Sequence, residues 1–168
     1  MSQARRTDCS LRRHLRSADR EPLRTLLDET GFFNREEIGV AMELVEDGLA
    51  LGEGSHYRFI VAEIGKQVAG YACWGPIPGT ADSADLYWIA VHPDRQGHGV
   101  GRALLTETES WMISEDRVRV WIETAGRALY GPTRAFYLGC GYLVAAELED
   151  YYGPGDPKLI FSRVLRRS

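Results

Sequence analysis

Apolar residues recur at helical spacing over the first third of the chain. Leucines three or four residues apart within 23–27 follow Ser17, whose hydroxyl can cap a helix. A second run with the same period begins after Asn34, another capping residue, and continues to about Leu51, where glycines end it. The two runs predict amphipathic helices with inward residues Leu23, Leu26, Leu27, Ile38, Ala41, Met42, Leu44, Val45 and Leu49.

The middle of the chain has a composition typical of β-strands. Residues 57–63 and 67–74 are rich in aromatic and β-branched side chains, and the link between them is short with a central glycine. Residues 85–91 resume the pattern until His92-Pro93-Asp94 ends it. These segments predict a meander of three strands, and a further short strand is expected at 11–15.

The last third predicts a helix, a strand, a short helix and a closing hairpin. A helix starts at Gly99, and residues 117–123 then alternate between apolar and polar side chains as a strand does. Residues 133–138 predict a short helix, followed by strands at 142–148 and 159–164. The inward residues of the first of these helices are expected to be Leu104, Leu105, Trp111 and Met112.

This order of elements predicts an α/β (α+β) fold. A meander, one helical crossover and a closing hairpin make a mixed, mostly antiparallel sheet of about six to seven strands flanked by about four helices. The 168 residues, 44% of them hydrophobic, are enough for one substantial core. A single domain over residues 1–168 is therefore expected, with residues 1–10 as a flexible tail.

The charge and composition of the chain indicate which kinds of binding partner are not expected. The formal net charge is -4, so no global basic field is available and a nucleic-acid partner is not expected. No stretch approaches the roughly 20 apolar residues of a membrane span, and a cytoplasmic protein without a membrane partner is expected. Three cysteines without a CxxC pair and four histidines without metal-ligand spacing predict no metal site.

A glycine-rich segment, Gln96–Arg102, lies between a predicted strand and a predicted helix. Glycines there let backbone N–H groups converge on an anion, and the helix N-terminus adds partial positive charge. A pyrophosphate is the natural ligand, although a turn that only caps the helix has the same pattern. The spacing GxGxG is not the dinucleotide fingerprint GxGxxG, and Gly101 is followed by Arg102 rather than by the lysine of a Walker loop.

Two longer strings resemble the GNAT superfamily of N-acetyltransferases. Residues 86–93, continuing through Gln96-x-x-Gly99-x-Gly101 to a pair of leucines, are similar to its coenzyme A motif. Residues 135–142 are similar to its later helix and turn, an apolar residue, a tyrosine, three residues, a glycine and an aromatic. Both strings occur in family order, and nearly the whole chain fits the family's arrangement, so the resemblance implies a GNAT-like fold.

The resemblance implies acetyl-CoA as co-substrate, with no metal. Backbone groups of the strand before the glycine segment would hydrogen-bond the pantetheine arm, while amides of that segment would hold the pyrophosphate. One departure is Tyr130, because many members carry asparagine at that position. The residues implied in coenzyme binding are Ile89, Ala90, Val91, Gln96, Gly97, His98, Gly99, Val100, Gly101, Arg102, Tyr130 and Arg134.

The implied reaction is direct transfer of an acetyl group to a primary amine of a small molecule or peptide. Tyr137, at the family's tyrosine position, is the candidate acid that protonates the departing thiolate; a packed aromatic is the alternative. Glu123 and Asp85 are candidate bases for the attacking amine, and each has the alternative of a solvated or ion-paired carboxylate. Cys140 is disfavoured as an acyl-carrying nucleophile, because the sequence places no histidine to activate it.

Other functions remain open from the sequence. A non-catalytic acyl-CoA-binding sensor would keep the phosphate cradle, and a nucleotide-dependent oxidoreductase would bind nicotinamide instead. The amine acceptor is not indicated, although residues on the two early helices could line its pocket, and the resemblance allows a homodimer. Those early residues are Phe32, Phe33, Glu36, Glu37 and Glu43.

Overall fold

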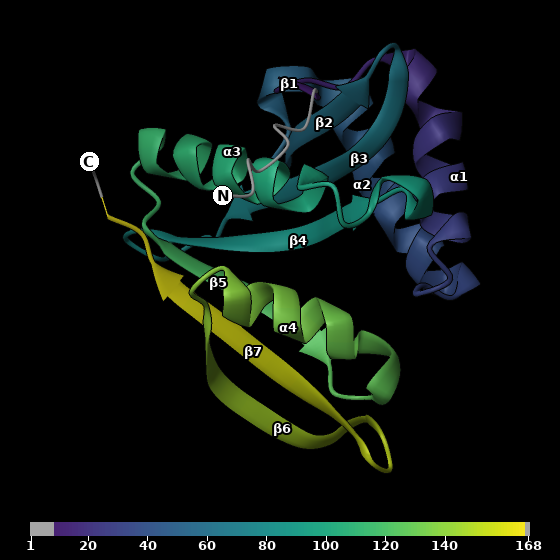
Figure 1. Cartoon of the computed structure of the whole chain (residues 1–168). Coiled ribbons are helices and arrows are strands. Elements are labelled where there is room, and N and C mark those ends of the chain that lie inside the picture. The colour runs from purple at the N-terminus through teal and green to yellow at the C-terminus, as the bar shows by residue number, and fades with distance from the viewer. Residues whose placement is uncertain (1–8, 167–168) are drawn as a thin grey trace, which may run out of the picture. The chain divides into compact units, whose positions relative to one another are not determined.

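The computed structural model of the chain describes residues 9–166 (Figure 1). Seven strands hydrogen-bond in the order β1-β2-β3-β4-β5-β7-β6. Their bounds are β1 Ser10–Arg12, β2 Arg58–Ile64, β3 Gln67–Pro76, β4 Ser83–Val91, β5 Arg119–Ala125, β6 Leu143–Gly153 and β7 Asp156–Val164. The α-helices are α1 Arg20–Glu29, α2 Arg35–Leu51, α3 Val100–Ser114 and α4 Gly131–Gly139, and short 3-10 helices are η1 Ser17–Asp19, η2 Gly52–Gly54, η3 Pro93–Arg95 and η4 Ala128–Tyr130.

These elements confirm the predicted fold class. Neighbouring strands pair antiparallel at β1/β2, β2/β3, β5/β7 and β6/β7, whereas β4 and β5 pair in parallel. A parallel pair needs a crossover connection, and α3 provides it. No helix in the described part of the chain is both long and apolar enough to cross a bilayer.

The described residues form two compact units, so the expected single domain stays a prediction. The N-terminal unit reaches to Trp74 and also includes Trp88–Ser110. The C-terminal unit consists of Gly75–Tyr87 and the chain from Trp111 onward. The expected tail at residues 1–10 lies largely outside the described residues, but Ser10 already belongs to β1 and pairs with Glu63.

In the N-terminal unit, helices α1 and α2 lie side by side (Figure 1). Helix α2 begins as predicted, because the Asn34 side chain accepts a hydrogen bond from the Glu37 N–H and the Glu37 carboxylate accepts one from the Asn34 N–H. Leu23, Leu26 and Leu27 of α1 are buried as expected. On α2, Leu44 and Leu49 are only partly buried, and Gly48 takes the inward position instead.

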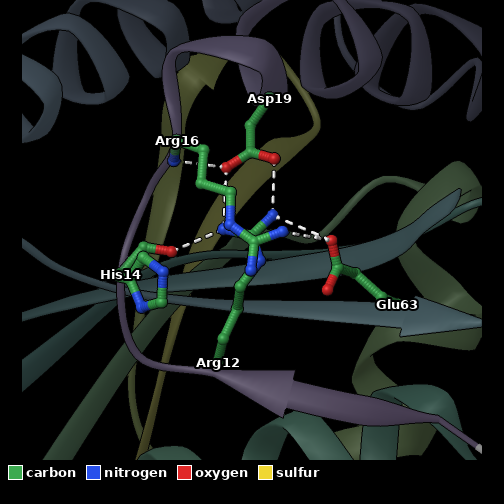
Figure 2. A network of polar contacts seen from close by, with 5 residues as sticks. All are labelled: Arg12, His14, Arg16, Asp19 and Glu63. Carbon is green, nitrogen blue, oxygen red and sulfur yellow. Dashed lines mark hydrogen bonds and ion pairs between the residues drawn. The ribbon is translucent and has the colours of Figure 1, made fainter. Parts of the chain in front are cut away.

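The start of the chain differs from the prediction, and the polar contacts of one arginine explain why. The Arg12 guanidinium donates to both carboxylate oxygens of Asp19, at 2.8 and 2.5 Å, and to Glu63 of β2 at 3.2 Å (Figure 2). It also donates to the His14 carbonyl at 2.6 Å, so β1 ends at Arg12 rather than at residue 15. The expected Ser17 cap is wrong, because Asp19 closes this turn by accepting from the Arg16 N–H at 2.6 Å.

In the C-terminal unit, Tyr137 of α4 packs on Phe161 of β7, the strand between β5 and β6. The closing hairpin is longer than predicted, since β6 continues to Gly153 and β7 already begins at Asp156. The expected loop between residues 148 and 159 is therefore wrong. A tight turn makes the extension feasible, because the Gly155 N–H donates to Asp150 at 2.8 Å and Gly155 has a φ of 74°. Strand β5 also begins at Arg119, two residues later than expected.

Two glycines of α2 give a matched stability prediction. A Cβ at Gly48 would lie 2.5 Å from Cε2 of Phe59, whereas a Cβ at Gly39 would meet nothing within 4 Å. Gly48→Ala should lower the free energy of unfolding by about 1–3 kcal/mol through overpacking. Gly39→Ala should raise it by up to about 1 kcal/mol through helix propensity. Chemical denaturation of both variants checks this, and equal effects would contradict the packing of α2 on β2.

Candidate active site

The glycine segment folds back onto the end of β4. The Gln96 side-chain amide donates to the Val91 carbonyl at 3.1 Å, and the Gln96 N–H donates to the Pro93 carbonyl at 3.3 Å. His98 Nδ1 lies 2.8 Å from the Gln96 carbonyl oxygen. These contacts make a compact, exposed turn between β4 and α3.

The backbone of this turn requires glycine at two positions. Gly97 and Gly99 have φ values of 74° and 85°, a region that other residues adopt only under strain. Residues 96–99 are exposed, so tight packing against neighbouring atoms is not the reason for glycine here. Glycine is therefore required by the backbone conformation of the turn.

The N-terminus of α3 opens directly from this turn. At the start of α3, the Ala103 N–H donates a hydrogen bond to the Gly99 carbonyl at 3.0 Å. The N–H groups of residues 100–102 have no helical carbonyl before them to bond, as at the start of any helix. They and the partial positive charge of a fifteen-residue helix suit a phosphate, so the residues present fit the diphosphate of coenzyme A.

A close approach between three elements fixes this helix start beside β4. A Cβ on Gly70 of β3 would lie 2.8 Å from the Ala90 carbonyl oxygen and 3.0 Å from Cδ1 of Leu104. Only a glycine lets β3 lie this close to both β4 and α3 without displacing backbone. His92, which follows β4, also contacts α1, with 2.7 Å between His92 Nε2 and Glu29 Oε2.

Tyr137 is a buried residue of α4 in the C-terminal unit. Its side chain is almost fully covered, and its ring centroid lies 5.5 to 6.0 Å from those of Phe136, Phe161 and Tyr142. Burial, followed by the neighbouring Cys140, raises the pKa of Tyr137 above its ordinary value. The phenol therefore stays protonated at neutral pH, as an acid must before it gives up its proton.

Glu123 lies on the other face of the same sheet. Adjacent residues of a strand point to opposite faces, and Ile122 of β5 pairs with Phe161, which packs on Tyr137. Glu123 pairs with Ile160 instead, so its side chain faces away from the Tyr137 ring. The structure thus does not bring Glu123 and the Tyr137 ring together on one face of the C-terminal unit.

Asp85 shares the face of Glu123. It pairs with Trp121 in the parallel register of β4 and β5, and Trp121 is two residues from Glu123 on β5. Burial raises the pKa of Asp85, the nearby negative charge of Glu123 raises it further, and Lys158 opposes them. The two candidate bases are therefore neighbours, and Asp85 is the one whose affinity for a proton is increased.

Tyr130 and Arg134 shape the connection between β5 and α4. The Arg134 guanidinium donates to the carbonyls of Ala125 and Arg127 at 3.0 and 2.9 Å. Tyr130 is buried, with the Arg127 guanidinium 5.1 Å from its ring centroid. Both side chains thus have structural partners, and a contact with the coenzyme stays a prediction for each.

Comparison with known sequences identifies the family. A sequence model of the acetyltransferase (GNAT) domain matches residues 55–144, just over half of the chain. The chain belongs to the GNAT acetyltransferase family. A comparison with curated proteins finds no match.

Solved structures agree with membership of the GNAT family. A Desulfovibrio desulfuricans protein, described as a GNAT-family acetyltransferase, is 40% identical with a TM-score of 0.90, covering 93% of this chain and 98% of its own. Ard1 from Thermoplasma volcanium is 18% identical with a TM-score of 0.76, covering 95% and 99%. The PaiA N-acetyltransferase of Thermoplasma acidophilum, solved with coenzyme A, is 19% identical with a TM-score of 0.73, covering 94% and 99%. The last two likenesses show the fold alone.

One charged residue near the candidate bases was not identified from the sequence of this GNAT chain. Lys158 is buried on β7, and its Nζ lies 2.5 Å from Glu123 Oε2. No local pattern indicated this, because Pro157 and the glycines before it are typical of a loop, where strand alternation does not apply. Within residues 9–166, no cluster of histidine, cysteine and acidic side chains is arranged to hold a metal ion.

Proposed function

We propose that the protein transfers the acetyl group of acetyl-CoA to a primary amine of a small molecule or peptide by direct attack. The observation that carries the proposal is the glycine turn before α3, with positive φ at Gly97 and Gly99 and backbone N–H groups that the helix does not use. Membership of the GNAT acetyltransferase family supports acetyl transfer, and a CoA-bound neighbour supports the coenzyme.

In the proposed reaction, groups of this chain bind the coenzyme, accept a proton from the amine and donate a proton to the thiolate. Acetyl-CoA supplies an acetyl group activated as a thioester. In the proposal, amides of residues 96–102 bind its diphosphate, and backbone groups of Ile89 and Val91 hold the pantetheine arm. A carboxylate takes a proton from the acceptor ammonium, and Tyr137 gives a proton to the departing sulfur. Burial keeps the Tyr137 phenol protonated at neutral pH but also makes it a weaker acid, so its proposed role rests on its position in the family motif.

The reaction is tested by release of coenzyme A. The protein is incubated with acetyl-CoA and a panel of amines: an aminoglycoside, a polyamine and a peptide that begins with alanine. The first and last follow the names of structural neighbours, an aminoglycoside 6'-N-acetyltransferase and a ribosomal-protein-S18-alanine N-acetyltransferase. We expect thiol release above background and an acetylated product by mass spectrometry with at least one amine. Binding of acetyl-CoA without release for any amine would favour the non-catalytic sensor.

The phosphate cradle is tested by substitution in the glycine turn. Gly97→Val and Gly99→Val force a β-branched residue into a positive-φ position and should displace the loop amides. Loss of hydrogen bonds to a charged diphosphate should raise the Kd for coenzyme A roughly tenfold or more by calorimetry. Gly79→Val is the matched control, because Gly79 has a φ of 76° but lies in the β3–β4 connection. Undiminished coenzyme binding in both turn variants would reject the cradle.

The acid is tested by Tyr137→Phe. The phenyl ring keeps the packing on Phe161 and Tyr142, so coenzyme affinity and melting temperature should change little. Loss of the proton donor should lower kcat by about 100-fold when chemistry limits turnover. Tyr142→Phe removes a hydroxyl from a buried tyrosine of the same cluster and serves as control. An unchanged kcat in Tyr137→Phe would remove Tyr137 as the acid.

A further inference from the structure

Lys158 is a buried cation whose partners lie on one side of the C-terminal unit. Its side chain is 10% exposed, and its Nζ is 2.5 Å from Glu123 Oε2. The same Nζ lies over the ring of Tyr151, 4.2 Å from the centroid. Burial opposes the charge of Lys158, but hydrogen bonds to Glu123 and Tyr151 outweigh it, so its pKa is raised. Lys158 is therefore charged at neutral pH.

This cation forms an ion pair with Glu123 and acts on Asp85 through its charge alone. Lys158 pairs across β7 and β5 with Ala125, two residues from Glu123, so Lys158 and Glu123 share a face. Asp85 lies on that face too, through its pairing with Trp121, but no ion pair joins it to Lys158. Lys158 therefore holds one oxygen of the Glu123 carboxylate in a charge-assisted hydrogen bond.

The charged groups that act on Asp85 come from two strands. Glu123 of β5 raises its pKa and Lys158 of β7 lowers it, while burial makes the largest contribution and raises it. Tyr152 of β6 is influenced by the same two charges, and burial raises its pKa, so it stays neutral. Two carboxylates with different surroundings usually divide the roles of base and charged support.

We propose that Lys158 is a positioning residue: it holds Glu123 in an ion pair and leaves Asp85 as the carboxylate that accepts the proton of the acceptor ammonium. This inference rests on the proposed acetyl transfer. Asp85 belongs to β4, the strand whose later residues are proposed to hold the pantetheine arm. Glu123 then serves as a fixed negative charge, half exposed, that favours a cationic acceptor.

The proton and electron balance is complete without another reactant. The ammonium nitrogen gives one proton to Asp85, directly or through one water, and its freed electron pair forms the C–N bond. The C–S bond breaks with its electron pair on sulfur, which takes a proton from Tyr137. The second proton of the nitrogen and the proton on Asp85 pass to solvent, and Tyr137 regains its proton from solvent.

The test is the pH dependence of kcat/KM with the amine that gives the fastest release of coenzyme A. Asp85→Asn should lower kcat by about 100-fold and remove the acidic limb of the profile. Lys158→Met should move that limb to higher pH, because Asp85 loses its cationic neighbour and more fully experiences the charge of Glu123. Lys158→Arg restores a cation and should return the limb toward its original position.

Folding is controlled by removing both partners of the ion pair. Replacing only Lys158 or only Glu123 leaves the other residue charged and without its ion-pair partner. The double variant Lys158→Met with Glu123→Gln removes both charges, so its melting temperature should fall less than that of Glu123→Gln alone. It should also keep the acidic limb. Loss of the limb in the double variant, or its persistence in Asp85→Asn, would overturn the assignment.

A measurement without acceptor separates this inference from the proposed function. Carbon-13 NMR of the Asp85 carboxyl group in the full-length protein should show its titration at higher pH in Lys158→Met than in the wild type. Absence of that shift overturns the role of Lys158, whether or not the protein is an enzyme. Absence of transfer to any amine, with the shift present, overturns the proposed function and the base role of Asp85 with it.

Discussion

The approach of β3 to β4 and α3 at Gly70 is the constraint on which the candidate coenzyme site depends. No side chain separates the β3 backbone from the Ala90 carbonyl and Leu104, so these elements lie within van der Waals contact. This places the first turn of α3 beside the end of β4. The glycine turn spans the short remaining distance, with Gln96 bonded back to Val91. Any residue larger than glycine at position 70 would disturb this arrangement before it affected the turn itself.

Electrostatics in the C-terminal unit follow from the pairing of three strands. The register of β4, β5 and β7 puts Asp85, Glu123 and Lys158 on one face, while the rings around Tyr137 fill the other. A buried lysine needs a partner, and Glu123 provides it, so two carboxylates that look equivalent in the sequence acquire different surroundings. In the N-terminal unit, the Arg12 guanidinium likewise forms ion pairs with Asp19 and Glu63. There the network only joins β1, η1 and β2 (Figure 2).

The elements predicted correctly are those with strong local signals. Asn34 with Glu37 three residues later marks the start of α2, and Gly65 marks the β2–β3 turn, where its φ is 64°. The wrong predictions lie where contacts with residues distant in the sequence determine the bounds of a strand. β1 stops at Arg12 because its guanidinium bonds groups on η1 and β2, and the closing hairpin extends because strand pairing continues past residues typical of loops.

The sequence by itself determined the order of helices and strands, the glycine turn before a helix and the resemblance to GNAT acetyltransferases, because periodicity, capping residues and short motifs are properties of neighbouring residues. Only the tertiary structure decided that Gly70 is required by a close approach, that Asp85 and Glu123 share a face opposite the Tyr137 ring, and that Lys158 is the partner of Glu123. These features depend on strand register and burial, which join residues tens of positions apart and leave no periodic trace along the chain.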